Sequence, residues 1–158
     1  MRKKSISKTK KKKRAISLKK KINKILVPID GSRNSFRALD FAISVSKSLK
    51  STITAVSIVD LPPVLEYGVI DPISKRLDAH QLKALQRAKS KVVKNRIKFE
   101  SKIIHGKTGN SIIQFAKKGK FDIIIMGARG VGGFSGLLVG SVSNHVIQKS
   151  KTPVLIIK

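Results

Sequence analysis

The fold is decided by FDIIIMGARG at residues 121–130 and by GSVS at residues 140–143, with nine residues between them. The first stretch opens with an apolar, β-branched run that has the length and composition of a buried strand, and this run stops at a glycine. In the second stretch and beyond it, Val142 and Val146 follow helical spacing, and Ser141 is a suitable helix N-cap. The two stretches therefore predict a strand, a glycine-rich loop and a helix, in that order.

A turn of this kind can hold a phosphate group. Backbone N–H groups at a helix start have no partner within the helix and lie at the positive end of the helix dipole. Glycines before the helix let an anion approach these groups without obstruction by side chains. The pattern therefore indicates nucleotide binding.

Strand-like and helix-like segments alternate along the rest of the chain. Apolar, β-branched runs predict strands at 25–29, 52–59, 121–126 and 153–158, and an alternating pattern predicts one at 97–105. Apolar periodicity predicts helices at 32–49, about 82–95, 109–118 and from 141 onward, and prolines with a glycine predict a loop at 60–72. This alternation predicts a three-layer, Rossmann-like α/β fold: a five-stranded parallel sheet with helices on both faces and right-handed crossovers.

The charge of the chain is unusual. The chain has 35 Lys and Arg against 8 Asp and Glu, a net charge of +27. Residues 1–24 hold 13 of the basic residues and no acid, and the remainder still carries +14. We expect residues 1–21 to be a disordered basic tail and residues 22–158 to form the folded domain. The tail could bind nucleic acid or another polyanion without sequence preference, since it has no aromatic residue for base stacking, or it could only add solubility.

Several classes of site are disfavoured by the residues present. The chain has no cysteine, and its three histidines have no recognised metal-ligand spacing. Ser101 stands where a P-loop ending at Thr108 needs glycine, and the glycines from 130 to 136 lack the dinucleotide-binding spacing. No Ser/His/Asp arrangement or carboxylate pair indicates a catalytic centre. No apolar run is long enough for a membrane span or a signal core, so we expect a cytoplasmic protein.

Three single residues have two interpretations each. Asp30 follows the first strand and could meet a ribose or a phosphate-bound Mg²⁺, or it could only begin an Asp-Gly-Ser turn and cap the next helix. Arg129 could pair with phosphate oxygens or point into solvent. For His145, one turn into the last helix, a partly buried structural position is favoured over a role in the site.

The motifs together resemble one known family. They are PIDGS at residues 28–32, the spacing Gly127-x2-Gly130-x9-Gly140-Ser141, and the closing stretch at 140–156. In this order they resemble the universal stress protein family, in its ATP-binding branch, and the resemblance covers residues 24–158. It implies the strand order 3-2-1-4-5, ATP as the ligand with Mg²⁺ or Mn²⁺, and a homodimer joined through the last strand.

The resemblance also implies which residues form the site. Pro28 and Ile58 are expected beside the adenine and ribose, Met126 near the base, and Asp30 at the nucleotide, where it could meet a bound divalent ion. The remaining expected residues hold ribose and phosphates: Gly127, Ala128, Arg129, Gly130 and Gly132 in the loop, and Gly140, Ser141, Val142 and Ser143 at the helix start.

Three functions are compatible with these observations. The first is a nucleotide-dependent regulatory protein of the stress response that binds ATP and hydrolyses it weakly at most. The second is a nucleic-acid-associated protein anchored by the lysine-rich tail. The third is an enzyme of adenylation or phosphoryl transfer, for which the sequence offers no catalytic residues.

Overall fold

The computed structural model describes residues 21–60, 72–132 and 138–158. Five strands form one parallel sheet in the order β3-β2-β1-β4-β5, as predicted. The elements are β1 (Lys24–Pro28), α1 (Arg33–Leu49), β2 (Thr52–Val59), α2 (Pro72–Val93), β3 (Phe99–His105), α3 (Thr108–Lys118), β4 (Ile123–Gly127), α4 (Ser141–Lys149) and β5 (Val154–Ile157).

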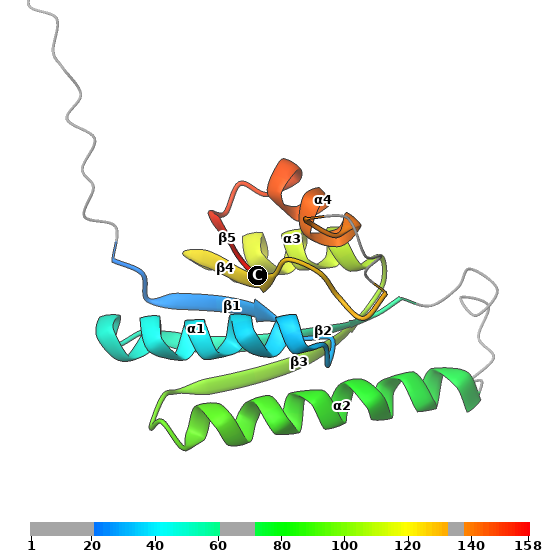
Figure 1. Cartoon of the computed structure of the whole chain (residues 1–158), viewed down its shortest axis with the longest axis horizontal. Coiled ribbons are helices and arrows are strands. Elements are labelled where there is room, and N and C mark those ends of the chain that lie inside the picture. The colour runs from blue at the N-terminus through cyan, green and yellow to red at the C-terminus, as the bar shows by residue number, and fades with distance from the viewer. Residues whose placement is uncertain (1–20, 61–71, 133–137) are drawn as a thin grey trace, which may run out of the picture.

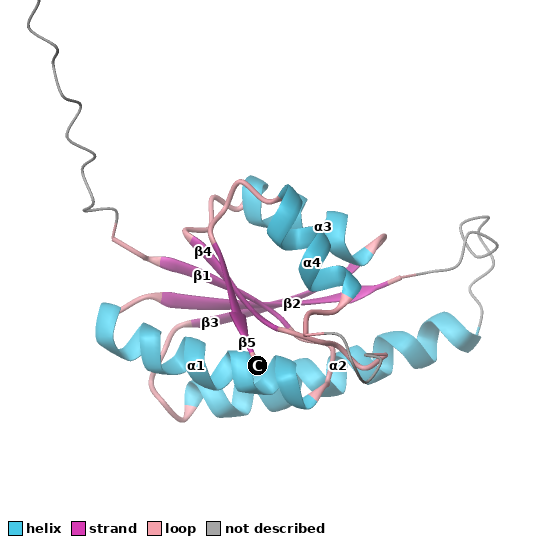
Figure 2. Cartoon of the chain, turned by 45° about the horizontal axis from the view of Figure 1, so that its top comes forward, coloured by secondary structure: helices cyan, strands magenta, loops and turns pink. Residues whose placement is uncertain are grey.

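The helices form two layers, one on each face of the sheet (Figure 1). Helices α1 and α2 cover one face, and α3 and α4 cover the other (Figure 2). The central strand β1 pairs with β2 on one side and with β4 on the other. Because both faces of the sheet are covered, its central strand β1 is a continuous apolar run, and Ile25, Leu26 and Val27 are each 0% exposed.

The apolar residues of the strands divide between two clusters. Ile25, Val27 and Ile53 pack under α1 and α2, whereas Leu26 and Ile124 pack under α3 and α4. Alternate residues of one strand point to opposite faces, so each strand contributes to both clusters.

Helix α2 and strands β3 and β4 begin at other residues than predicted, and β4 begins at Ile123 instead of residue 121. Helix α2 begins at Pro72 instead of about residue 82, because proline is compatible with the first helical position even though it was read as a loop signal. Strand β3 begins at Phe99 instead of residue 97. Most of the loop predicted at 60–72 and the basic tail lie outside the described residues.

Candidate functional site

A pocket of about 800 Å³ lies at the carboxyl ends of β1 and β4. These neighbouring strands are where the strand order changes direction, which is the usual ligand position of open α/β sheets. The pocket is lined by twelve of the thirteen residues expected from the sequence: Pro28, Asp30, Ile58, Met126, Gly127, Arg129, Gly130, Gly132, Gly140, Ser141, Val142 and Ser143. The fold therefore brings four separate segments to one cavity.

Asp30 connects the first turn to the glycine loop. Its Oδ1 accepts a hydrogen bond from the Ser32 amide at 2.9 Å, and its Oδ2 accepts one from the Val131 amide at 3.1 Å. Asp30 does begin a turn, but the cap of α1 is Ser32, whose hydroxyl accepts from the Ser35 amide at 3.1 Å. The Asp30 carboxylate consequently holds two walls of the pocket together.

Glycine is needed at position 130 because a side chain there would collide with Asp30, and not because the backbone adopts a positive φ. Positive φ among the described glycines occurs only at Gly31 and Gly106. A Cβ added to Gly130 would lie 2.5 Å from Asp30 Oδ2, whereas a Cβ added to Gly132 would meet no atom within 4 Å. A side chain at 130 would therefore displace the carboxylate that joins turn and loop.

Helix α4 begins one residue away from the predicted N-cap. Gly140 is the N-cap and Ser141 the first helical residue, so the prediction that Ser141 caps the helix was wrong. The Gly140 amide donates to the Ala128 carbonyl at 2.7 Å, which fixes the chain in the extended entry that an N-cap adopts. No side chain caps α4, so its first-turn N–H groups face the pocket without a competing side-chain acceptor.

Ser143 and Ala128 support the site from behind. The Ser143 hydroxyl is buried and donates to the Gly127 carbonyl at 2.9 Å, which ties α4 to the end of β4. Ala128 is the expected residue that does not line the pocket; it is 2% exposed, and its amide donates to the Ile157 carbonyl at 2.8 Å. Ser143 thus positions the loop through its hydroxyl and Ala128 through its backbone amide.

Arg129 is half-buried at the pocket and does not extend freely into solvent. Its carbonyl accepts a hydrogen bond from the Asn34 side chain at 3.2 Å, so the loop is also attached to the first turn of α1. His145 is half-buried, as predicted, and its Nε2 lies 2.7 Å from Asn110 Oδ1. That contact joins α4 to α3 outside the pocket.

Sequence reasoning missed the pocket residues that come from α2 and α3. His80 and Gln81 reach the pocket from α2, and Thr108 reaches it from the start of α3. Gln81 hydrogen-bonds to the Ser57 hydroxyl on β2 at 2.5 Å. No local motif marks these residues, because they approach the strand ends only through the packing of α2 and α3 on the sheet.

Comparison with known proteins identifies the family. The model of the universal stress protein family matches residues 21–158. The chain belongs to the universal stress protein family. A universal stress protein of Methanocaldococcus jannaschii is 33% identical over 138 residues, covering 85% of this chain and 81% of the relative. Universal stress protein YxiE of Bacillus subtilis is 33% identical over 147 residues, covering 86% and 99%.

Solved structures of this family share the fold. The universal stress protein UspA from Lactobacillus plantarum has a TM-score of 0.76 and 26% identity, over 87% of this chain and 99% of that one. A universal stress protein solved in complex with cAMP has a TM-score of 0.69 and 22% identity, covering 86% and 97%. One from Archaeoglobus fulgidus, solved in complex with dAMP, has a TM-score of 0.67 and 23% identity, covering 86% of this chain and 98% of that one.

Within the described residues, no helix has both the length and the apolar character that crossing a membrane demands.

Proposed function

We propose that this universal stress protein binds ATP in the pocket at the ends of β1 and β4 and acts as a nucleotide-dependent regulatory protein in the cytoplasm. The observation that carries the proposal is the hydrogen bond from the Val131 amide to Asp30 Oδ2, in a pocket that also includes the start of α4, where no side chain caps the helix. The Asp30 carboxylate can accept from a ribose or bind a metal, and the backbone N–H groups of the same pocket are suited to phosphates.

The walls of the pocket suit the parts of an adenine nucleotide. Pro28, Ile58 and Met126 supply apolar surface for a base, and the loop from 127 to 132 supplies glycines for close approach to phosphates. Adenine nucleotides occupy two related proteins, which were solved with cAMP and dAMP. The proposal for this chain extends that chemistry to a triphosphate, for which a pocket of about 800 Å³ has room.

A divalent ion fits the same arrangement. Each oxygen of the Asp30 carboxylate accepts one backbone N–H and keeps a further lone pair, and oxygen is the ligand that Mg²⁺ prefers. Asp30 would hold Mg²⁺ or Mn²⁺ together with the nucleotide phosphates. When bound, the ion neutralises phosphate charge, and the described pocket offers no nucleophile–base pair for rapid hydrolysis.

The test is calorimetric titration of the full chain with ATP, with and without Mg²⁺. We expect a dissociation constant in the micromolar range, about −8 kcal/mol, with tighter binding when Mg²⁺ is present. GTP at the same concentration serves as the control for the base. Absence of heat with ATP at millimolar concentration would contradict the proposal.

We further propose a homodimer joined through β5. This strand is at the edge of the sheet, and its four apolar side chains are only half-buried. Helices α1 and α4 flank it and leave Phe41, Leu49 and Ile147 exposed at 43%, 38% and 44%. An apolar edge strand of this kind favours pairing with a second copy. Light scattering over a dilution series should show a dimer, and a monomer alone at micromolar concentration would remove the claim.

A further inference from the structure

The α1–α2 layer carries a strip of positive charge that the nucleotide pocket does not use. The strip, here called the α1–α2 groove, consists of exposed side chains of these two neighbouring helices and of the residue that follows α2. Its basic members are Arg37 and Lys47 on α1, Lys83, Arg87 and Lys91 on α2, and Lys94 directly after α2. Those on α2 follow positions i, i+4 and i+8, so they form one row along the helix.

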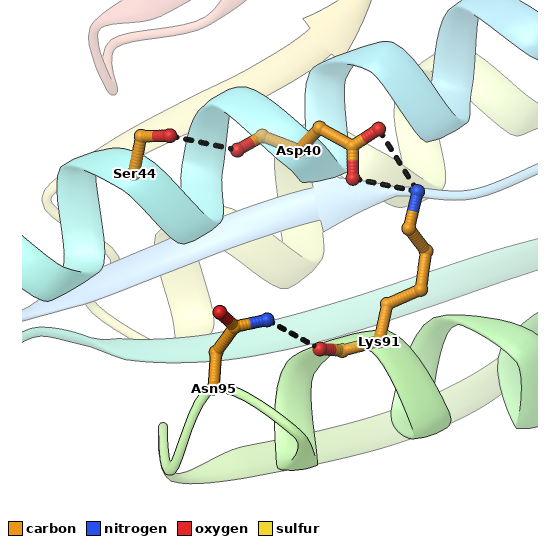
Figure 3. A network of polar contacts seen from close by, with 4 residues as sticks. All are labelled: Asp40, Ser44, Lys91 and Asn95. Carbon is orange, nitrogen blue, oxygen red and sulfur yellow. Dashed lines mark hydrogen bonds and ion pairs between the residues drawn. The ribbon is translucent and has the colours of Figure 1, made fainter.

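Contacts between the helices show that the row of cations on α2 lies against α1. Lys91 Nζ lies 2.6 Å from Asp40 Oδ1 of α1. Figure 3 shows this ion pair, with Ser44 one turn further along α1 and Asn95 just after the end of α2. One turn earlier on α2, the Arg87 guanidinium lies 4.6 Å from the centre of the Phe36 ring. Arg87 and Lys91 therefore both lie beside the Phe36 ring of α1.

The charge of the groove is far from balanced. Asp40 is the single acid among the described side chains of α1 and α2, and it already pairs with Lys91. The other basic groups of the groove have no acidic partner in the described part of the chain. The unpaired cations of the groove repel each other, and a bound polyanion relieves this repulsion.

The dimensions of the groove match a nucleic-acid backbone. The row from Lys83 to Lys91 extends for roughly 12 Å at 1.5 Å per residue, the length of about three to four phosphates of one strand. Packed helices lie about 8–10 Å apart, a spacing between the widths of the minor and major grooves of duplex DNA. The row on α2 can thus follow the phosphates of one strand, and Arg37 and Lys47 of the neighbouring α1 add exposed positive charge beside it.

The placement of apolar side chains argues against a membrane surface as the partner. Exposed Phe41 and Leu49 lie on the flank of α1 toward β5, and exposed Leu82 and Val93 lie on the far flank of α2. Phe36, at the centre of the groove, is 9% exposed beneath Arg87. A lipid-binding face needs apolar anchors among its cations, and here they point elsewhere.

We propose that the α1–α2 groove binds the phosphate backbone of a nucleic-acid duplex, without reading base sequence. The groove has no exposed aromatic ring for stacking between its rows, and its cations reach phosphates and not base edges. The site is separate from the nucleotide pocket, whose lining includes none of the six basic residues.

The test compares two variants of the full chain that each lose four positive charges and keep the tail intact. In the groove variant, Arg37, Lys47, Lys83 and Lys94 are changed to Gln, which spares the side chains that contact Phe36 and Asp40. In the control variant, the exposed residues Lys117, Lys118, Lys149 and Lys151 of the opposite layer are changed to Gln. Circular dichroism and ATP titration verify that each variant is folded.

Affinity for a 20-base-pair duplex is measured as a function of salt concentration. We expect the groove variant to bind at least tenfold more weakly than the parent, with a log–log salt slope shallower by about 2 to 4 units, against less than about 1 unit for the control variant. An equal loss in both variants would overturn the proposal, as would unchanged binding by the groove variant. The proposal would also be overturned if the groove variant lost binding to phosphatidylserine vesicles but still bound the duplex. The groove would then bind a membrane surface.

Discussion

The nucleotide pocket and the α1–α2 groove are two anion-binding surfaces built in different ways. The pocket uses backbone N–H groups, glycines and a single carboxylate in a cavity at the strand ends. The groove uses exposed side-chain cations on the outer surface of two helices. A backbone site depends on close geometry and selects a ligand by shape, whereas a side-chain site depends on charge density and selects a ligand by its total charge.

Because of this difference, one added methyl group should weaken ligand binding in the pocket but leave binding at the groove unchanged. Gly127 and Gly130 have atoms within 3 Å of the position of an added Cβ. The cations of the groove lie in solvent, where one substitution changes affinity by a single phosphate contact. Substitutions that change geometry should therefore weaken binding in the pocket, and substitutions that remove charge should weaken binding at the groove.

Salt concentration should have the most different effects on the two surfaces. Between 50 and 200 mM salt we expect duplex affinity to fall about 1,000-fold if six phosphates are neutralised, because counterions compete for each of them. ATP affinity should fall by less than about tenfold, since a half-enclosed pocket is screened less. Titrations of both ligands over the same salt series measure this, and parallel slopes would contradict two separate modes of binding.

Gly130→Val should disable the pocket alone. The added Cβ displaces the Asp30 carboxylate from the Val131 amide, so we expect ATP to bind at least 100-fold more weakly, a loss of about 2.7 kcal/mol or more. Gly132→Val separates the two causes of a loss, because a Cβ at 132 meets no protein atom within 4 Å and can obstruct only the ligand; the weakening of ATP binding in Gly130→Val beyond that in Gly132→Val is the effect of displacing Asp30. Duplex affinity should be unchanged in both variants. Equal ATP binding by Gly130→Val and the parent would overturn the site assignment.

Gly127→Ala should have a smaller effect that reaches both surfaces. A Cβ at Gly127 would lie 2.7 Å from the backbone carbon of Asn34, at the point where β4 packs on α1. Strand and helix must separate, and we expect a loss of about 1–3 kcal/mol in the free energy of unfolding. Urea denaturation measures the loss, with Gly132→Ala as the control of equal size. A stability equal to that of the control would show that α1 moves at no cost.

Much of the fold followed from local patterns. Continuous apolar runs identified β1, β2, β4 and β5, because strands covered on both faces need no polar alternation, and the alternating pattern at 97–105 identified β3. The predicted start of α2 was wrong, because Pro72 can begin a helix as well as interrupt one. The cap of α4 failed by one residue, because glycine and serine both suit that position and the Gly140–Ala128 hydrogen bond decides between them.

The sequence by itself determined the order of strands and helices, the family, and the glycines and carboxylate that gather at the strand ends. These features depend on residue type and spacing over short stretches. Only the tertiary structure decided that Asp30 bonds to Val131, that Gln81 and Thr108 reach the pocket, and that Lys91 of α2 pairs with Asp40 of α1. The bonds of Gln81 to Ser57, of Lys91 to Asp40 and of Val131 to Asp30 join residues 24, 51 and 101 positions apart, and the packing of helices on the sheet decides which of these residues meet.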